Sequence, residues 1–119
     1  MEWIEGIPFK EALQRYGKSI IALALKSCYL LDLCGVEHSE IKGEKHLIYD
    51  GKRIRIIDFE SARFKEKPRN LLQFLGYHIL RREDLLREFN VNRNRLLELT
   101  EKYKENPEKT FTKILTLLG

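Results

Sequence analysis

The segment from residue 19 to residue 34 constrains the fold of this chain more than any other part of the sequence. It reads SIIALALKSCYLLDLC, so apolar side chains would occupy nearly every side of a helix built from it. Such a helix is stable only when other elements cover it all round. Gly35 follows, and glycine is the usual residue just beyond a helix end. We therefore expect a helix from about Ser19 to Cys34 at the centre of one domain.

A β-hairpin and further helices are expected around this central helix. Strands are predicted at residues 46–49 and 53–57, because Asp50-Gly51 between them is a strong hairpin signal. A basic connector is expected at residues 61–69. Apolar periodicity, with Gly and Pro at the boundaries, predicts helices at residues 8–16, 70–80, 83–89, 92–104 and 107–118. The predicted fold class is mainly α with one small antiparallel β-hairpin.

Some side chains can be assigned to the core in advance. In the helix at residues 92–104, Leu96, Leu97 and Leu99 form an apolar stripe together with Tyr103. Cys28 and Cys34 are expected to be small buried apolar residues that do not pair with each other.

Length and composition indicate a single soluble domain spanning residues 1–119. Hydrophobic residues make up 43% of the 119 positions and charged residues 34%, which is typical of a globular chain. No segment has the pattern of a secretion signal or a membrane span. We therefore expect a cytoplasmic protein without membrane contact.

The segment from Gly35 to Phe64 carries residues suited to phosphoryl transfer. His38 and Glu40 form a His-x-acid motif after the central helix, and Asp58 directly follows the second predicted strand. Glu40 and Asp58 are 18 positions apart with the hairpin between them, so both carboxylates are expected at one end of the hairpin. A rigidly held carboxylate is a suitable oxygen ligand for Mg²⁺, and an acid near the attacking hydroxyl can accept its proton.

These motifs resemble those of protein kinases. The run His38-Ser39-Glu40-Ile41-Lys42 resembles the catalytic loop His-Arg-Asp-Leu-Lys, and Asp58-Phe59-Glu60 resembles the metal-binding Asp-Phe-Gly. The resemblance is nearest to small archaeal-type predicted serine/threonine kinases related to RIO kinases. In these, a Leu-Asp-x-x-Gly-Val-x-His run, here residues 31–38, and a Lys-His pair, here residues 45–46, flank the loop. It implies that Glu40 is the catalytic acid–base group, that Lys42 neutralises the transferring phosphate, and that Asp58 binds Mg²⁺.

The N-terminal residues extend the resemblance. The segment MEWIEGIP, residues 1–8, resembles the kinase hinge that binds adenine, while the sequence holds neither a Gly-rich loop nor a Val-Ala-Ile-Lys strand. On this alignment residues 36–60 are the catalytic-loop and metal-loop region, and the chain corresponds to the C-terminal lobe of a kinase without its N-lobe. The resemblance implies ATP and Mg²⁺ as cofactors, with nucleotide contacts from Glu2, Ile4, Lys45, Leu47 and Ile57.

A lone C-terminal lobe is expected to need partners. The resemblance implies a protein substrate, together with an N-lobe-bearing partner chain or self-association. The contact would use apolar surface that we expect to be exposed near Trp3, Ile4, Leu47 and Ile48.

Departures from the family pattern leave two alternatives open. Glu40 stands where kinases have Asp, Lys45 where they have Asn, and Glu60 where they have Gly. These departures favour a non-catalytic kinase-like binding module as one alternative. The other is a basic RNA- or ribosome-associated domain, since the net charge is +4, although acidic residues are interspersed throughout. The cations that would form its surface are Arg53, Arg55, Arg63, Lys65, Lys67, Arg69, Arg81, Arg82, Arg93 and Arg95.

Overall fold

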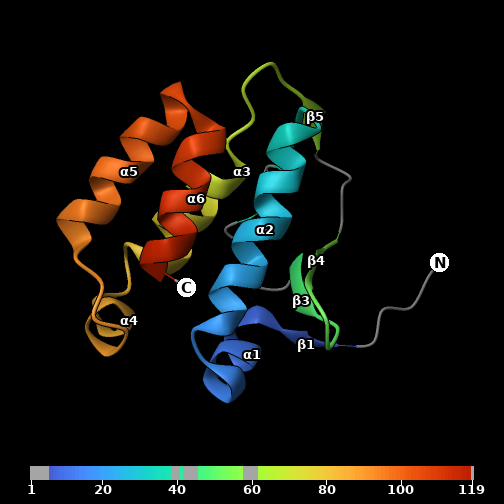
Figure 1. Ribbon diagram of the computed structural model, residues 1–119. Coiled ribbons are helices and arrows are strands. Elements are labelled where there is room, and N and C mark those ends of the chain that lie inside the picture. Colours follow the sequence, from blue (N-terminus) through green and yellow to red (C-terminus); the bar gives the residue numbers. More distant parts are fainter. Residues whose placement is uncertain (1–5, 39–40, 42–45, 58–61, 119) are drawn as a thin grey trace.

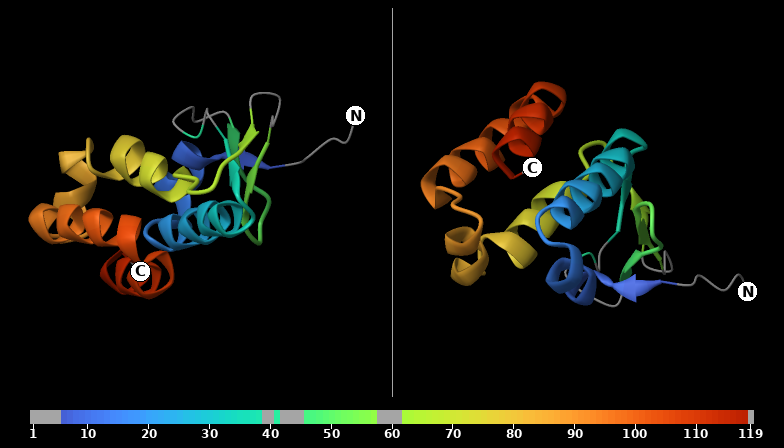
Figure 2. Two further views of the ribbon diagram at one scale, coloured as in Figure 1. Left: turned by 90° about the horizontal axis from the view of Figure 1, so that it is seen from above. Right: turned by 60° about the horizontal axis from the view of Figure 1, so that its bottom comes forward.

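Helix α2 (Ser19–Leu33) runs through the middle of the molecule, as its apolar sequence predicts (Figure 1). The computed structural model describes residues 6–38, 41, 46–57 and 62–118. Within these residues, short strands lie on one side of α2 and the C-terminal helices on the other, an arrangement that is also clear from above in Figure 2. Gly35 ends the helix with a φ of 75°, a backbone conformation that side chains other than glycine rarely adopt.

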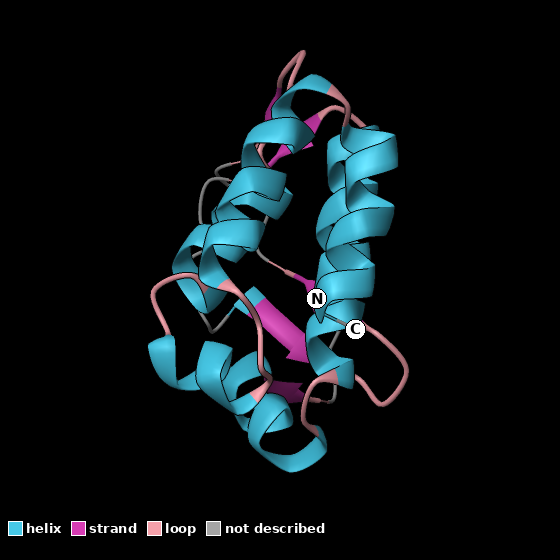
Figure 3. Ribbon diagram, turned by 60° about the vertical axis from the view of Figure 1, so that its left-hand side comes forward, coloured by secondary structure: helices cyan, strands magenta, loops and turns pink. Residues whose placement is uncertain are grey.

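Helices make up most of the molecule, as Figure 3 shows, and their positions agree closely with the sequence prediction. The helices besides α2 are α1 (Phe9–Tyr16), α3 (Asn70–Phe74), η3 (Leu75–Ile79), α4 (Glu83–Glu88), α5 (Arg93–Glu105) and α6 (Pro107–Leu118). The strands are β1 (Ile7–Pro8), β2 (Val36–Glu37), β3 (Leu47–Tyr49), β4 (Ile54–Ile56) and β5 (Arg63–Phe64). The predicted mainly α fold class with a small antiparallel β-hairpin is confirmed.

The predicted hairpin is formed by β3 and β4, and it belongs to a larger sheet. Leu47 pairs with Ile56 and Tyr49 with Ile54 in the antiparallel register. Strand β1 adds to the other side of β3, which gives the order β1-β3-β4. The pairing of β1 was not predicted, because the sequence signals of Pro8 indicate only the start of a helix. Pro8 can lie in β1 because β1 is an edge strand.

A second small sheet, formed by β2 and β5, corrects the expectation of loops at these positions. Val36 pairs with Phe64 and Glu37 with Arg63, so the start of the basic connector is fixed against the segment that follows α2. Lys65 lies beside Glu37 as an ion pair, and the Lys65 N–H donates to the Gly35 carbonyl at 2.8 Å. Two-residue strands are too short to show a periodic pattern, so they could not be predicted from the sequence.

The predicted helix at residues 70–80 changes its hydrogen-bonding pattern halfway. Residues 70–74 are α-helical, whereas Leu75–Ile79 form a π-turn in which the Leu80 N–H donates to the Leu75 carbonyl at 2.8 Å. Such turns insert one extra residue into a helix and are frequent at functional sites. Here the π-turn contains the buried His78.

The core packs against α2 but leaves Leu30 and Leu33 of that helix 59% and 62% exposed, so the expectation that other elements cover α2 all round is wrong. Among the side chains assigned to the core in advance, two differ from the prediction. Leu96, Leu99 and Tyr103 are buried as expected, but Leu97 is 38% exposed because it lies on the outer side of α5. Cys28 is buried, and its pKa is raised, mainly by burial and secondarily by Asp32. Cys34, in contrast, is exposed at the end of α2, so the expectation that both cysteines are buried is wrong for Cys34.

None of the helices in the described residues combines the length and the apolar character that crossing a membrane requires. The longest of them, α2, has 15 residues.

We predict that Gly6→Ala destabilises the protein through the β1–β3 pairing. A Cβ at Gly6 would lie 2.6 Å from Ile48 Cγ2 and closer still to the Tyr49 carbonyl oxygen, so backbone would have to move. The expected loss is about 1–3 kcal/mol of unfolding free energy in urea denaturation. The control is Gly76→Ala, since a Cβ at Gly76 meets no atom within 4 Å. Equal stability of the two variants would contradict the prediction.

Candidate functional site

Most of the predicted phosphotransfer residues are next in the chain to residues that the structure describes. Glu2, Ile4, Glu40, Lys42, Lys45 and Asp58 all lie outside the residues that the structure describes. His38, Ile41, His46, Leu47 and Ile57 are described, and they are the neighbours of those residues in the chain. What the structure shows in this region is how these neighbours are held.

His38 connects the two motif segments directly. Its ring is buried, and Nε2–H donates a hydrogen bond to the Ile57 carbonyl at 2.9 Å. The Ile57 N–H in turn donates to the His46 carbonyl at 2.9 Å, so both polar backbone groups of Ile57 have partners. The ring centroids of His38 and His46 are 5.5 Å apart. The buried His38 ring therefore joins the segment after α2 to the residue that follows β4.

Asn70, the first residue of α3, holds the backbone of His38. The His38 N–H donates to Asn70 Oδ1 at 2.7 Å, and Asn70 Nδ2 donates to the Val36 carbonyl at 2.6 Å and to Asp32 Oδ1 at 2.9 Å. Asn70 is fully buried, and its side chain thus uses its acceptor and both of its N–H donors within the protein. An aspartate at position 70 would have no side-chain N–H to donate. One of its oxygens would then face the Val36 carbonyl and the Asp32 carboxylate, which are both acceptors.

His78 in the π-turn holds the middle of the loop. Its Nε2–H donates to the Ile41 carbonyl at 3.0 Å, and the Ile41 side chain is fully buried. The His78 ring also packs against Phe9 and Phe74, with centroid distances of 5.4 and 5.2 Å. The π-turn therefore lies where this helix hydrogen-bonds to the backbone of Ile41.

Asp32, near the end of α2, joins three helices. Its carboxylate accepts hydrogen bonds from Asn70 N–H at 2.8 Å, Asn70 Nδ2 at 2.9 Å, Leu71 N–H at 3.3 Å and the Tyr103 hydroxyl. Burial raises the pKa of Asp32 above its usual value, and these hydrogen bonds oppose that rise. Burial and the Asp32 carboxylate also raise the pKa of Tyr103, so its hydroxyl stays a donor throughout the neutral range.

Two of the predicted nucleotide-contact residues can be located. The side chain of Leu47 is fully buried in the core, and that of Ile57 is partly buried. The expected exposed apolar surface therefore does not include Leu47, because this strand residue belongs to the hydrophobic core. Ile48 is partly buried, while Trp3 and Ile4 lie outside the described residues.

Several of the cations suggested for a nucleic-acid surface are paired with carboxylates. Arg55 lies 2.6 Å from Asp50, Arg82 lies 2.9 Å from Asp84, and Arg95 lies 3.1 Å from Glu98. The Asp50 pKa is lowered, chiefly by the hydrogen bond from Arg55. These pairs reduce the positive field that a phosphate backbone would meet.

The described residues hold no group of three or more His, Cys, Asp and Glu side chains placed to bind a metal ion.

Comparison with known proteins finds a relative that matches part of this chain. Uncharacterized protein MJ1211 of Methanocaldococcus jannaschii is 35% identical over 74 residues, which cover 59% of this chain and 64% of that protein. The chain thus matches less than two thirds of the length of this relative. No family model matches the chain.

We predict that Tyr103→Phe destabilises the protein more at neutral pH than at acid pH. Removing a donor from Asp32 raises the pKa of its carboxyl in the folded state further above the unfolded value of about 3.9. A raised folded-state pKa means stability that is present below the unfolded pKa and is lost as pH rises. The loss relative to wild type should therefore grow from near zero at about pH 3.5 to about 1–3 kcal/mol at pH 7.

Chemical denaturation at several pH values measures this dependence. Tyr29→Phe is the matched control, because Tyr29 packs on Phe111 with ring centroids 4.0 Å apart and its ring, not its hydroxyl, makes that contact. A pH-independent loss in Tyr103→Phe would show that its hydroxyl does not stabilise an ionised Asp32.

Proposed function

We propose that this chain is the large lobe of a kinase-like phosphotransferase that uses ATP and Mg²⁺. The observation that supports this most is the 2.9 Å hydrogen bond from His38 to the Ile57 carbonyl. His38 lies two residues before Glu40, and Ile57 lies directly before Asp58, so the bond links the two motifs that resemble kinase motifs. Phosphoryl transfer depends on positioning more than on covalent chemistry, and such a link is what positioning requires.

The remaining anchors support the same proposal. Asn70 fixes the backbone before Glu40, and His78 fixes the carbonyl of Ile41, which lies between Glu40 and Lys42 in the chain. Rigid backbone on either side of catalytic side chains reduces the reorganisation that the reaction needs. The mainly α fold with antiparallel strands is also compatible with a kinase C-terminal lobe.

Each motif residue has a defined role in the proposal. Asp58 follows a residue whose backbone groups are both hydrogen-bonded, and its carboxylate is a suitable oxygen ligand for Mg²⁺, which offsets charge on the phosphates. Glu40 accepts the proton of the attacking hydroxyl, and Lys42 faces the negative charge of the phosphoryl group being transferred. Lys45 contributes a fixed positive charge toward phosphate, and Glu2, Ile4 and Ile57 belong to the nucleotide contacts implied by the resemblance. Leu47, the remaining implied contact, has its side chain fully buried in the core.

A non-catalytic kinase-like module is the main alternative. It is favoured by Glu40, Lys45 and Glu60, the three residues that depart from the kinase pattern. The two proposals make opposite predictions for phosphate transfer, which the experiments below measure.

We predict that the chain by itself binds Mg-ATP weakly. The sequence has no Gly-rich loop and no Val-Ala-Ile-Lys lysine, and these supply many of the phosphate contacts in kinases. Calorimetric titration should give a Kd of about 1 mM or weaker, which corresponds to roughly −4 kcal/mol. Micromolar affinity would mean that other residues of the chain replace those contacts.

We also predict that Asp58 and Glu40 can be separated by mutation. In phosphate-transfer assays at millimolar Mg-ATP, with a kinase N-lobe fused or added, Asp58→Ala should abolish both transfer and Mg²⁺-dependent nucleotide binding. Glu40→Ala should retain nucleotide binding and lower turnover about 10²-fold or more. Glu40→Asp should retain or raise activity, since it restores the side-chain length of the family.

The control for these variants is Asp84→Ala, which removes an exposed carboxylate that pairs with Arg82 and belongs to neither motif. It should leave transfer unchanged. Transfer by Asp58→Ala at the wild-type rate would refute the phosphotransferase proposal. A wild-type protein that transfers no phosphate under any of these conditions would favour the non-catalytic module.

A further inference from the structure

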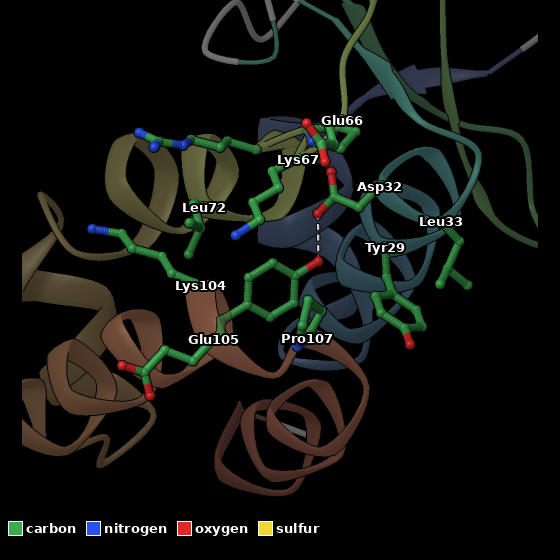
Figure 4. A pocket seen from close by; sticks show the side chains of 12 residues that line it. Tyr29, Asp32, Leu33, Glu66, Lys67, Leu72, Lys104, Glu105 and Pro107 are labelled. Carbon is green, nitrogen blue, oxygen red and sulfur yellow. Dashed lines mark hydrogen bonds between the residues drawn. The ribbon is translucent and has the colours of Figure 1, made fainter.

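A pocket of about 230 Å³ lies between the end of α2, the connector before α3 and the junction of α5 with α6 (Figure 4). Its wall is mostly apolar and includes the Tyr29 and Tyr103 rings, Leu72, Pro68 and Pro107. None of these residues belongs to the motifs of the proposed phosphotransfer site. The pocket is smaller than the roughly 300–1,000 Å³ of sites for drug-sized ligands, so it fits a smaller molecule.

The charges around the pocket differ in their availability. Asp32 lies at the wall, but its carboxylate already accepts hydrogen bonds from Asn70, Leu71 and Tyr103, so it offers little to a cationic ligand. In Figure 4 the Glu105 carboxylate points away from Asp32 and outward. Glu66 lies above Asp32, at the connector side of the pocket.

Two ammonium groups lie on one side of the pocket. The Lys67 and Lys104 side chains extend on the side of Leu72, across the pocket from Tyr29 and Leu33. Lys104 is paired with the exposed Glu101 at 3.2 Å. Lys67 and Arg69, which also lines the pocket, belong to no ion pair among the described residues. The pocket therefore combines an apolar wall with an available positive charge at one end.

We propose that this pocket binds a small amphipathic acid, with its apolar body against the Tyr103 ring, Leu72 and Pro107 and its carboxylate beside Lys67. Burial of an apolar body supplies most of the affinity, and the ion pair at the partly exposed end selects acids over neutral and basic analogues. The proposal is independent of the phosphotransferase proposal, because it uses none of the same side chains.

The test uses three probes that differ in one polar group: phenylacetate, phenylacetamide and phenethylamine. Binding is followed by ¹⁵N NMR titration of the full chain, through the amide signals of Lys67, Leu72, Tyr103 and Lys104. Phenylacetate should bind about two- to fivefold more tightly than phenylacetamide, the range that a partly exposed ion pair contributes. Phenethylamine should bind more weakly than both.

Charge removal then identifies the lysine. Lys67→Gln should lower the affinity for phenylacetate toward that for phenylacetamide, because Lys67 is the cation placed beside the carboxylate, and should leave phenylacetamide binding unchanged. The matched control is Lys102→Gln, because Lys102 lies on α5 outside the pocket. Phenethylamine binding as tightly as phenylacetate, an unchanged preference in Lys67→Gln, or no binding of any probe at 10 mM, a concentration far above a Kd of ~1 mM, would each overturn the proposal.

Discussion

The packing of α3 and α5 against α2 depends on the hydrogen bonds that the Asp32 carboxylate accepts. It is partly buried, and an unpaired buried carboxylate would be costly, so its donors must be in place for the native structure to form. Those donors come from the start of α3 and the end of α5, so the charge fixes both helices against α2. Asn70 links Asp32 to the segment after α2, because its side-chain amide donates to Asp32 and also accepts from the His38 N–H.

Two buried histidines complete the support of the loop, and each acts as a hydrogen-bond donor to backbone. His38 donates to the carbonyl of Ile57, and His78 donates to that of Ile41. Buried backbone carbonyls need partners, and residues in irregular segments cannot find them in a helix or sheet. The side chains therefore take the place of regular secondary structure around the candidate site. In the phosphotransferase proposal, Glu40, Lys42 and Asp58 are the chain neighbours of the two residues whose carbonyls are held in this way.

The sequence allowed most of the fold to be predicted, because its signals are local. The apolar run of α2 and the Asp50-Gly51 turn each specify an element within a few residues. The structure adds that Asn92, where the helix at residues 92–104 was predicted to begin, is the N-cap of α5 and accepts from the Arg95 N–H at 3.1 Å. The pairing of β2 with β5 and the π-turn at Leu75–Ile79 were missed, since neither has a periodic pattern or a marker residue.

The candidate site was predicted only in part, for a different physical reason. The motif residues around His38 stand out by their types and spacing, but their supports lie far away in the chain. Asn70 is 32 positions from His38, and His78 is 37 positions from Ile41. An asparagine at the start of a helix and a histidine within one are ordinary residues in a single sequence. Only the folded chain brings them to the loop.

The separation of Asp32 from Tyr103 also has a consequence for how the protein is made. The two residues are 71 positions apart. At synthesis rates of about 5–20 residues per second, roughly 4–14 s pass between the synthesis of Asp32 and that of Tyr103, its last donor. During that time water must solvate it, and the apolar surface of α2 that α6 later covers stays open. The nascent chain therefore cannot bury this part of its central helix until α5 and α6 have been added.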